Sequence, residues 1–204
     1  MSPDTATRER LVETAARLWH ARSYADVGVS EICDEAGVKK GSFYHFFPSK
    51  SAVALAVLDR RSEQAQKYIF RPAFAEDASP IERLVGLIQI HHRMQSAMHA
   101  ETGAVMGCPV GNLAIELSTQ DEHVRERCAQ LLEDWASQVE HLLAEAVEAG
   151  ELPPIDTERA GLAVIAYAEG ILLLAKTRND PELIQQLGHG VKQLVGAFGI
   201  ATNN

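Results

Sequence analysis

Apolar residues recur every three or four positions along most of the chain, which is the spacing of amphipathic helices. In residues 5–22, for example, Leu11, Ala15, Leu18 and Trp19 fall on one helical face. No stretch shows the strict alternation of apolar and polar residues, rich in β-branched side chains, that marks a half-buried strand. The pattern therefore predicts an all-α fold.

Residues that favour the start or the end of a helix divide the chain into about nine predicted helices. Serine and aspartate cap helix N-termini, glycine ends helices, and proline is favoured at the first helical position. In the first part of the chain the expected helices are 5–22, a short one from Ser30 to Gly37, 40–46 before Pro48, and 50–73 after a Ser49 cap. Later starts are expected at the Ser79-Pro80-Ile81-Glu82 capping box, at Thr119 with Glu122, at Asp156, and at Asp180-Pro181 for a last helix to Phe198.

The two short helices before Pro48 have the lengths and spacing of a helix-turn-helix. Their apolar residues can close against the first helix; they are Ile32, Cys33, Ala36, Val38, Phe43, Phe46 and Phe47. We expect an N-terminal three-helix domain at 1–50, a connecting helix at 51–74 and a C-terminal helical bundle at 75–204.

The other face of the third helix carries only hydrogen-bond donors and a glycine, which lets a backbone approach a phosphate closely. It consists of Lys40, Gly41, Ser42, Tyr44 and His45, with Lys39 just before it. No acidic residue occurs between Glu35 and Asp59. This face is a candidate for binding DNA. The alternative is a helical hairpin that merely packs and leaves a solvated polar face.

The charge is distributed unevenly, and this supports the same location. The whole chain carries a net charge of −9, which disfavours binding of nucleic acid by the entire surface. Residues 1–62, however, have nine Lys and Arg against eight Asp and Glu, a net of +1. Any contact with DNA should therefore lie in the first third, and the acidic remainder should have another role.

The run from Gly37 to Lys50, Gly-Val-Lys-Lys-Gly-Ser-Phe-Tyr-His-Phe-Phe-Pro-Ser-Lys, resembles the DNA-binding signature of the TetR family of regulators. Ser30, Ile32 and Ala36-Gly37 fit the same pattern, whereas Ser51 departs from it, because the family often has Glu there. The resemblance implies that Ser30, Tyr44, His45 and Lys50 contact phosphates. Lys40, Gly41 and Ser42 would face base edges, beside Lys39. It also implies a cytoplasmic homodimer that reads a pseudo-palindromic double-stranded operator, with repression as the default output.

By the same resemblance, residues 75–204 hold an effector pocket and the dimer interface. Small residues between 157 and 178 allow close helix approach, and the last helix adds an apolar face, so helices 156–178 and 180–199 are expected to form the dimer. Packing within one chain explains the same pattern. Candidate pocket residues mix apolar bulk with polar groups: His91, Gln95, Met98, Leu113, Leu117, Trp135, Gln138 and Tyr167. Each of them is also compatible with plain core or surface.

Cys108 is a candidate sensor. It precedes Pro109 at the expected start of a helix, and a helix N-terminus favours the nucleophilic thiolate. Residues Met106–Ser118, together with Lys176 as a nearby positive charge, resemble the electrophile-sensing TetR branch that controls N-ethylmaleimide reductase, although Pro109 and Asn112 depart from it. The alternative is a small buried side chain. Core positions are expected for Cys33 and Cys128.

The sequence lacks the motifs that mark other classes of protein. There is no HExxH, ExxH, GxGxxG, P-loop or GxSxG motif, so we expect neither an enzyme nor a metal or cofactor, with a helical enzyme as the alternative. Apolar runs fall short of the roughly 20 residues of a membrane span. Three cysteines without close pairing and a polar N-terminus are typical of a reducing cytoplasm.

Overall fold

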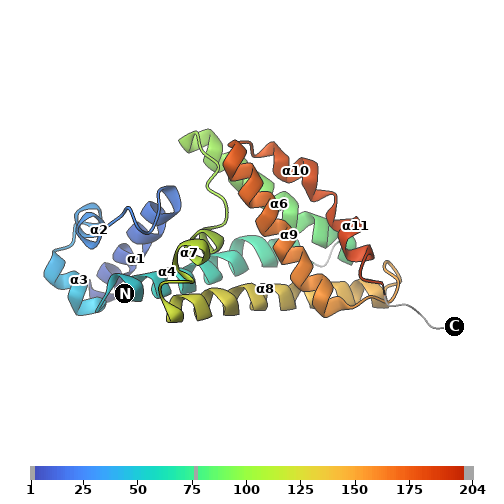
Figure 1. Cartoon of the computed structure of the whole chain (residues 1–204), viewed down its shortest axis with the longest axis horizontal. Coiled ribbons are helices and arrows are strands. Elements are labelled where there is room, and N and C mark those ends of the chain that lie inside the picture. Colours follow the sequence, from blue (N-terminus) through green and yellow to red (C-terminus); the bar gives the residue numbers. More distant parts are fainter. Residues whose placement is uncertain (1–2, 76–77, 200–204) are drawn as a thin grey trace. The chain divides into compact units, whose positions relative to one another are not determined.

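The computed structural model describes residues 3–75 and 78–199. Over these ranges the chain is built from helices joined by short turns, and the only β-type pairing there is an isolated bridge between Ile155 and Gly199 (Figure 1). The predicted all-α class is confirmed. The helices are α1 (Pro3–Ala21), α2 (Val29–Ala36), α3 (Lys40–Phe46), α4 (Lys50–Ala65), the π-helical turn η1 (Gln66–Phe70), α5 (Arg71–Ala73), α6 (Pro80–Thr102), α7 (Pro109–Leu117), α8 (Glu122–Glu148), α9 (Thr157–Arg178), α10 (Glu182–Gly188) and α11 (Val191–Gly196).

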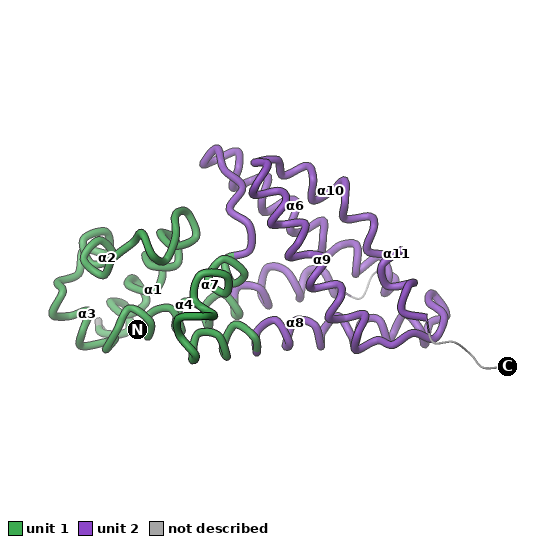
Figure 2. The backbone as a smooth tube through the Cα atoms, viewed as in Figure 1, with its two compact units in different colours: residues 1–63, 109–129 green, residues 64–108, 130–204 purple. Residues whose placement is uncertain are grey.

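The chain forms two compact units (Figure 2). Unit 1 comprises residues 1–63 and 109–129, and unit 2 comprises residues 64–108 and 130–204. The N-terminal helices therefore share a unit with α7 and the first turns of α8, which come from the middle of the chain.

Most of the predicted helix starts are confirmed. The capping box of α6 has both of its bonds: Glu82 N donates to Ser79 Oγ (3.4 Å), and Ser79 N donates to Glu82 Oε2 (3.0 Å). Asp156 caps α9 by accepting from Arg159 N (3.1 Å). Ser49 caps α4 by accepting from Ala52 N (3.0 Å).

Two predicted caps are wrong. α2 begins two residues earlier than predicted, with Gly28 as its N-cap, so Ser30 lies inside the first turn. α8 is capped by Asp121, whose Oδ1 accepts from Val124 N (3.0 Å), and Thr119 lies two residues before that cap. In both cases a neighbouring residue takes the cap position.

Two long helices are interrupted where one continuous helix was predicted. After Ala65 the helix passes through the π-helical turn, in which Arg71 N donates to Gln66 O, before α5. The last helix is divided into α10 and α11. A Cβ on Gly188 would lie 2.4 Å from Ile88 Cγ2, and one on Gly190 would lie 2.3 Å from Tyr167 Oη. Glycines at this corner therefore allow close packing against α6 and α9.

The core of unit 2 lies among α6, α8, α9, α10 and α11. A Cβ on Gly161 of α9 would lie only 2.7 Å from Ala136 O of α8, so these two backbones pack closely. Among the described helices, α9 alone is long and apolar enough to cross a membrane by length and composition, a test that core helices of soluble proteins also pass. Its inner face is buried within the unit, at Ala160, Gly161, Val164, Ile165, Ala168, Ile171, Leu172 and Ala175.

Candidate nucleic-acid interface

The helix-turn-helix forms because Phe43 anchors α3 in the interior of unit 1. Phe43 is fully buried, with its ring centroid 5.9 Å from that of Phe47, and Ile32 of α2 is fully buried as well. Trp19 Nε1 of α1 donates to Val27 O (3.4 Å) and so joins α1 to the start of α2. The prediction that Phe46 is also buried is wrong: it is half-buried beside His45. The helix ends at Phe46, and the extended backbone of the next residue carries the ring of Phe47 into the interior instead.

The turn between α2 and α3 is set by local backbone chemistry. Gly37 adopts the left-handed conformation (φ 63°) and donates its N–H to Asp34 O, while Val38 N donates to Cys33 O (2.9 Å). These bonds satisfy the last carbonyls of α2, as predicted for a glycine terminator. Lys39 is then extended and serves as the N-cap of α3.

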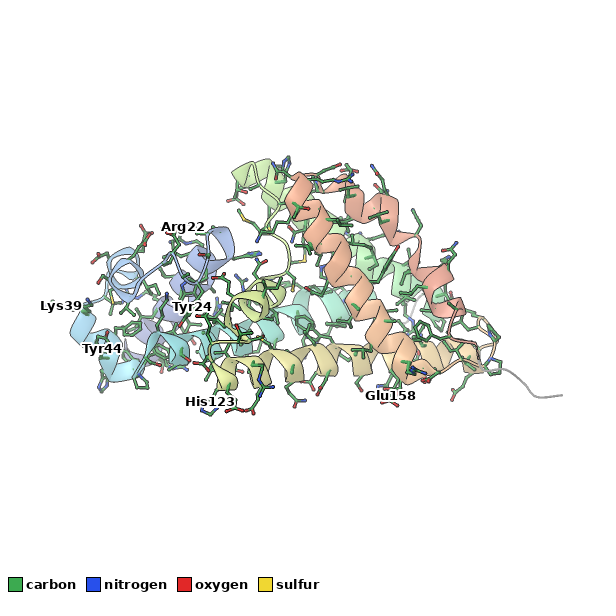
Figure 3. The ribbon with its side chains drawn as sticks, in the orientation of Figure 1. Arg22, Tyr24, Lys39, Tyr44, His123 and Glu158 are labelled. Atoms are coloured by element: carbon green, nitrogen blue, oxygen red, sulfur yellow. The ribbon has the colours of Figure 1, made fainter. Side chains whose placement is uncertain are left out.

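The residues predicted to meet DNA lie together on the outside of this motif. Tyr44 is 53% exposed, and Lys39 and Tyr44 are labelled on this surface in Figure 3. A Cβ on Gly41 would meet no atom within 4 Å, so the backbone of α3 is open to a close approach there. We call this set the recognition surface; its exposed members are Ser30, Lys39, Lys40, Gly41, Ser42, Tyr44 and His45.

Lys50 differs from the other predicted contacts because it is partly buried. Its Nζ donates to Tyr24 O and lies 3.9 Å from the centroid of the Tyr24 ring. Burial lowers the pKa of Lys50, and the negative charge of Glu116 acts in the opposite direction. Lys50 thus holds the turn between α1 and α2 in this structure, and its contact with a phosphate stays a prediction.

Sequence reasoning missed the polar contacts that join α7 and α8 to these helices within unit 1. Glu116 of α7 accepts from Tyr24 N and from Ala25 N, both at 3.1 Å. Asp121 accepts from the Ser51 hydroxyl, and this bond is the main cause of a lowered pKa of Asp121. Arg127 donates to Asp59 Oδ1 (2.8 Å). The partners lie 68 to 92 residues apart, so no local pattern could have indicated them.

The predicted effector-pocket residues are distributed over both units. Leu113 and Leu117 are buried on α7 in unit 1, and the other six lie in unit 2. Tyr167 donates its hydroxyl to Leu187 O (2.7 Å), and Trp135 contacts Phe70 (6.1 Å between centroids), so both stabilise the packing of unit 2.

The remaining members lie on α6 and α8. Burial lowers the pKa of His91 to about 4, and Met98 O accepts from the Thr102 hydroxyl (2.7 Å). Gln138 lines a hollow of about 620 Å³, together with Phe74, Arg83, His141, Leu142 and Glu145.

Gln95 and Asn179 hold the segment that leads into α7. Gln95 Oε1 accepts from Met106 N and Gly107 N, both at 3.1 Å, and its Nε2 donates to Gly107 O (3.1 Å). Asn179 Oδ1 accepts from Val105 N (2.8 Å). Side chains from α6 and from the end of α9 therefore fix the backbone just before Cys108.

Cys108 lies directly before Pro109, the first residue of α7, as predicted. It is buried, 9% exposed, and its thiol is hydrogen-bonded to Glu169 of α9. Burial raises the pKa of Glu169, and the bond from Cys108 opposes that shift. A bond that lowers the pKa of a carboxyl group is one that its carboxylate accepts, so the Cys108 thiol is the donor. Lys176, the predicted source of positive charge, lies two helical turns beyond Glu169.

The other cysteines occupy core positions, as expected. Cys33 and Cys128 are 3% and 2% exposed. Burial raises the pKa of both thiols, that of Cys128 to about 11.

Comparison with known proteins agrees with this geometry. Residues 11–57 match the N-terminal domain described as bacterial regulatory proteins of the tetR family, and residues 80–190 match the tetracyclin repressor-like C-terminal domain. A transcriptional regulator of the helix-turn-helix type from Lactococcus lactis is 32% identical over 182 residues, 88% of each chain. The transcriptional repressor DhaR of Mycobacterium is 30% identical over 185 residues, 89% of this chain and 88% of DhaR.

A solved structure extends the agreement to three dimensions. The reduced form of NemR from Escherichia coli superposes with a TM-score of 0.80 at 25% identity, covering 93% of this chain and 97% of NemR. The helix-turn-helix, the all-α architecture and both domain matches lead to one conclusion. This chain belongs to the TetR family of bacterial regulatory proteins and is a DNA-binding transcriptional regulator.

Proposed function

We propose that the protein is a cytoplasmic repressor that binds a pseudo-palindromic operator as a homodimer. The observation that carries this proposal is the recognition surface itself. It presents lysines, hydroxyls and an open glycine backbone on α3, and Phe43 holds that helix from beneath. Two copies of α3 would enter successive major grooves about 34 Å apart.

Individual roles follow from the chemistry of each side chain. Lys40, Gly41 and Ser42 lie at the start of α3 and would face base edges, where hydrogen bonds distinguish base pairs. Ser30, Lys39, Tyr44 and His45 would contact phosphates, which position the protein without reading sequence. Lys50 would join them through another of its three ammonium donors while it keeps its bond to Tyr24 O.

The proposed dimer interface is an apolar stripe on α9. Leu162, Leu173 and Leu174 are 57%, 50% and 47% exposed within one chain. Ala166 and Gly170 are also exposed on this helix, and small side chains let two helices approach closely. Leu187 of α10 is 37% exposed and would extend the contact. A second copy covering this stripe would bury side chains that water now reaches.

Residues 75–204 would hold the effector site, and effector binding would favour a dimer with a different separation of the two α3 helices. In unit 2 the pocket would include the predicted residues His91, Gln95, Met98, Trp135, Gln138 and Tyr167. Repression requires only that effector and DNA prefer different conformers. Both DhaR and NemR are named as repressors.

Release by an electrophile at Cys108 is a second candidate mechanism, supported by the position of the thiol before α7. Its bond to Glu169 means that the thiol proton must first move to that carboxylate, and Lys176 would stabilise the resulting negative charge. Cys108→Ser keeps a donor for Glu169 but removes the nucleophile. The serine variant should remain bound to operator after treatment with a maleimide or a quinone. Normal release by that variant would leave a reversible ligand as the effector.

In vitro selection of bound genomic fragments tests the central proposal. The purified protein at low ionic strength should enrich a two-fold symmetric sequence and prefer it over random competitor duplex. A protein that retains all fragments equally would contradict the assignment of base reading to α3.

A further inference from the structure

The main chain of Tyr24 is held from two sides within unit 1. Its N–H, with that of Ala25, donates to the two carboxylate oxygens of Glu116, one to each, at 3.1 Å. Its C=O accepts from Lys50 Nζ at the start of α4. The Tyr24 ring lies beneath the same ammonium group and 4.9 Å from the ring of Trp19. One peptide therefore connects α7, α4 and the core of the helix-turn-helix.

The Glu116 carboxylate satisfies both amide donors of this turn with one side chain. Its two oxygens can each accept from one N–H group, and charged acceptors form the stronger hydrogen bonds. The negative charge also lies close enough to Lys50 to affect that ammonium group. Two further contacts keep α8 against α4, namely Asp121 with Ser51 and Arg127 with Asp59.

We propose that Glu116 is a positioning residue for DNA binding. It fixes the turn between α1 and α2 and the Lys50 side chain, so that the recognition surface has the geometry that fits the operator. This inference rests on the proposed function, because it concerns how well the protein binds a specific duplex.

The same residue would carry the effector signal. α7 begins at Pro109, directly after the segment that Gln95 and Asn179 hold. An effector or a thiol adduct that displaces this segment pulls on the first residue of α7, and Glu116 lies seven residues further along that helix. The displacement would reach Tyr24 and Lys50 through two hydrogen bonds.

The variant Glu116→Gln tests the proposal, with Glu122→Gln as its matched control. Glutamine replaces one carboxylate oxygen by an NH₂ group and removes the charge. The two amides must then share one neutral oxygen, as Met106 N and Gly107 N do at Gln95, and their hydrogen bonds weaken. Glu122 is exposed in the first turn of α8 and contacts Arg125 (3.3 Å), and the control makes the same change in charge within the same unit.

Electrostatics alone and the positioning role predict opposite changes in the operator affinity of Glu116→Gln. Removing a negative charge weakens the repulsion of phosphates, so electrostatics alone makes both variants bind all duplexes somewhat more tightly. The positioning role predicts that Glu116→Gln binds the selected operator about 10 to 100 times more weakly, the effect of exchanging two hydrogen bonds to a charged acceptor for two weaker bonds to a neutral one. Binding to random duplex should stay within about threefold of the wild type, and Glu122→Gln should not lose operator affinity.

The experiment measures affinity for selected and random duplexes, with circular dichroism melting of each protein. Lys50→Met and the double variant Glu116→Gln/Lys50→Met complete a double-mutant cycle. Because both side chains act through Tyr24, the double variant should lose less affinity than the product of the two single losses. Should Glu116→Gln fail to fold, Glu116→Asp keeps the charge but shortens the reach, and the same selective loss is expected.

Operator binding by Glu116→Gln as tight as that of the control would overturn the proposal. An equal loss of operator and random binding that follows the loss of helical signal would also overturn it, since Glu116 would then act in folding alone. If the wild-type protein itself shows no preference for the selected duplex, the proposed function fails instead, and the two failures are thereby distinguished.

Discussion

Replacing Gly161 by alanine should destabilise the protein, although alanine is the better helix former. The new Cβ would lie 2.7 Å from Ala136 O and 3.1 Å from Glu140 N, both backbone atoms of α8. Backbone atoms cannot turn aside as a side chain can, so α8 and α9 must move apart by some tenths of an ångström. Overpacking of this kind costs about 1–3 kcal/mol. The higher helix propensity of alanine offsets about 1 kcal/mol of this cost, so the free energy of unfolding should fall by up to about 2 kcal/mol.

Gly86→Ala is the matched control, because Gly86 lies within α6 and its Cβ would meet no atom within 4 Å. That variant should gain about 1 kcal/mol from helix propensity alone. For a chain of this size each kcal/mol moves the melting temperature by about 2–4 °C. Thermal unfolding at one protein concentration should therefore show Gly161→Ala below the wild type and Gly86→Ala above it. A higher melting temperature for Gly161→Ala would refute the close packing of the two backbones.

Three further predictions address the interfaces and the pH response. Leu173→Glu should shift the protein toward monomer in sedimentation velocity, whereas Ile115→Glu, at an exposed position of unit 1, should leave the dimer intact. Lys39→Ala should lower the slope of the salt dependence of DNA binding by about 0.9 for each phosphate that this lysine neutralises. The control Arg17→Ala should leave that slope unchanged, because Arg17 pairs with Glu35 (2.9 Å) in the wild type. The lowered pKa of His91 means that the unfolded chain binds a proton between about pH 6.5 and 4 that the native protein does not. Stability should therefore fall over that window as the pH is lowered, by at most about 1.4 kcal/mol per pH unit relative to His91→Asn, as measured by urea unfolding.

Predictions based on local backbone chemistry were the most successful. Gly37 ends α2, α3 spans the predicted residues, and Ser79 and Asp156 form the predicted caps. Each of these features depends on residues within four positions of each other. The predictions failed where neighbouring residues competed for one cap, at Ser30 and Thr119. They also failed where packing against another helix interrupted a continuous pattern, as at Gly188 and Gly190.

For this protein, the order of residues along the chain was enough to identify the helices, the buried Phe43 and the cationic face of α3, because helical periodicity and capping are short-range effects. The tertiary structure alone decided which polar groups meet. It brings Glu116 to Tyr24, Cys108 to Glu169 and Asn179 to Val105 across separations of 61 to 92 residues, counted along the chain. Such pairs leave no periodic trace in the sequence, because each partner resembles any other polar residue until folding removes its water and leaves one donor or acceptor within reach.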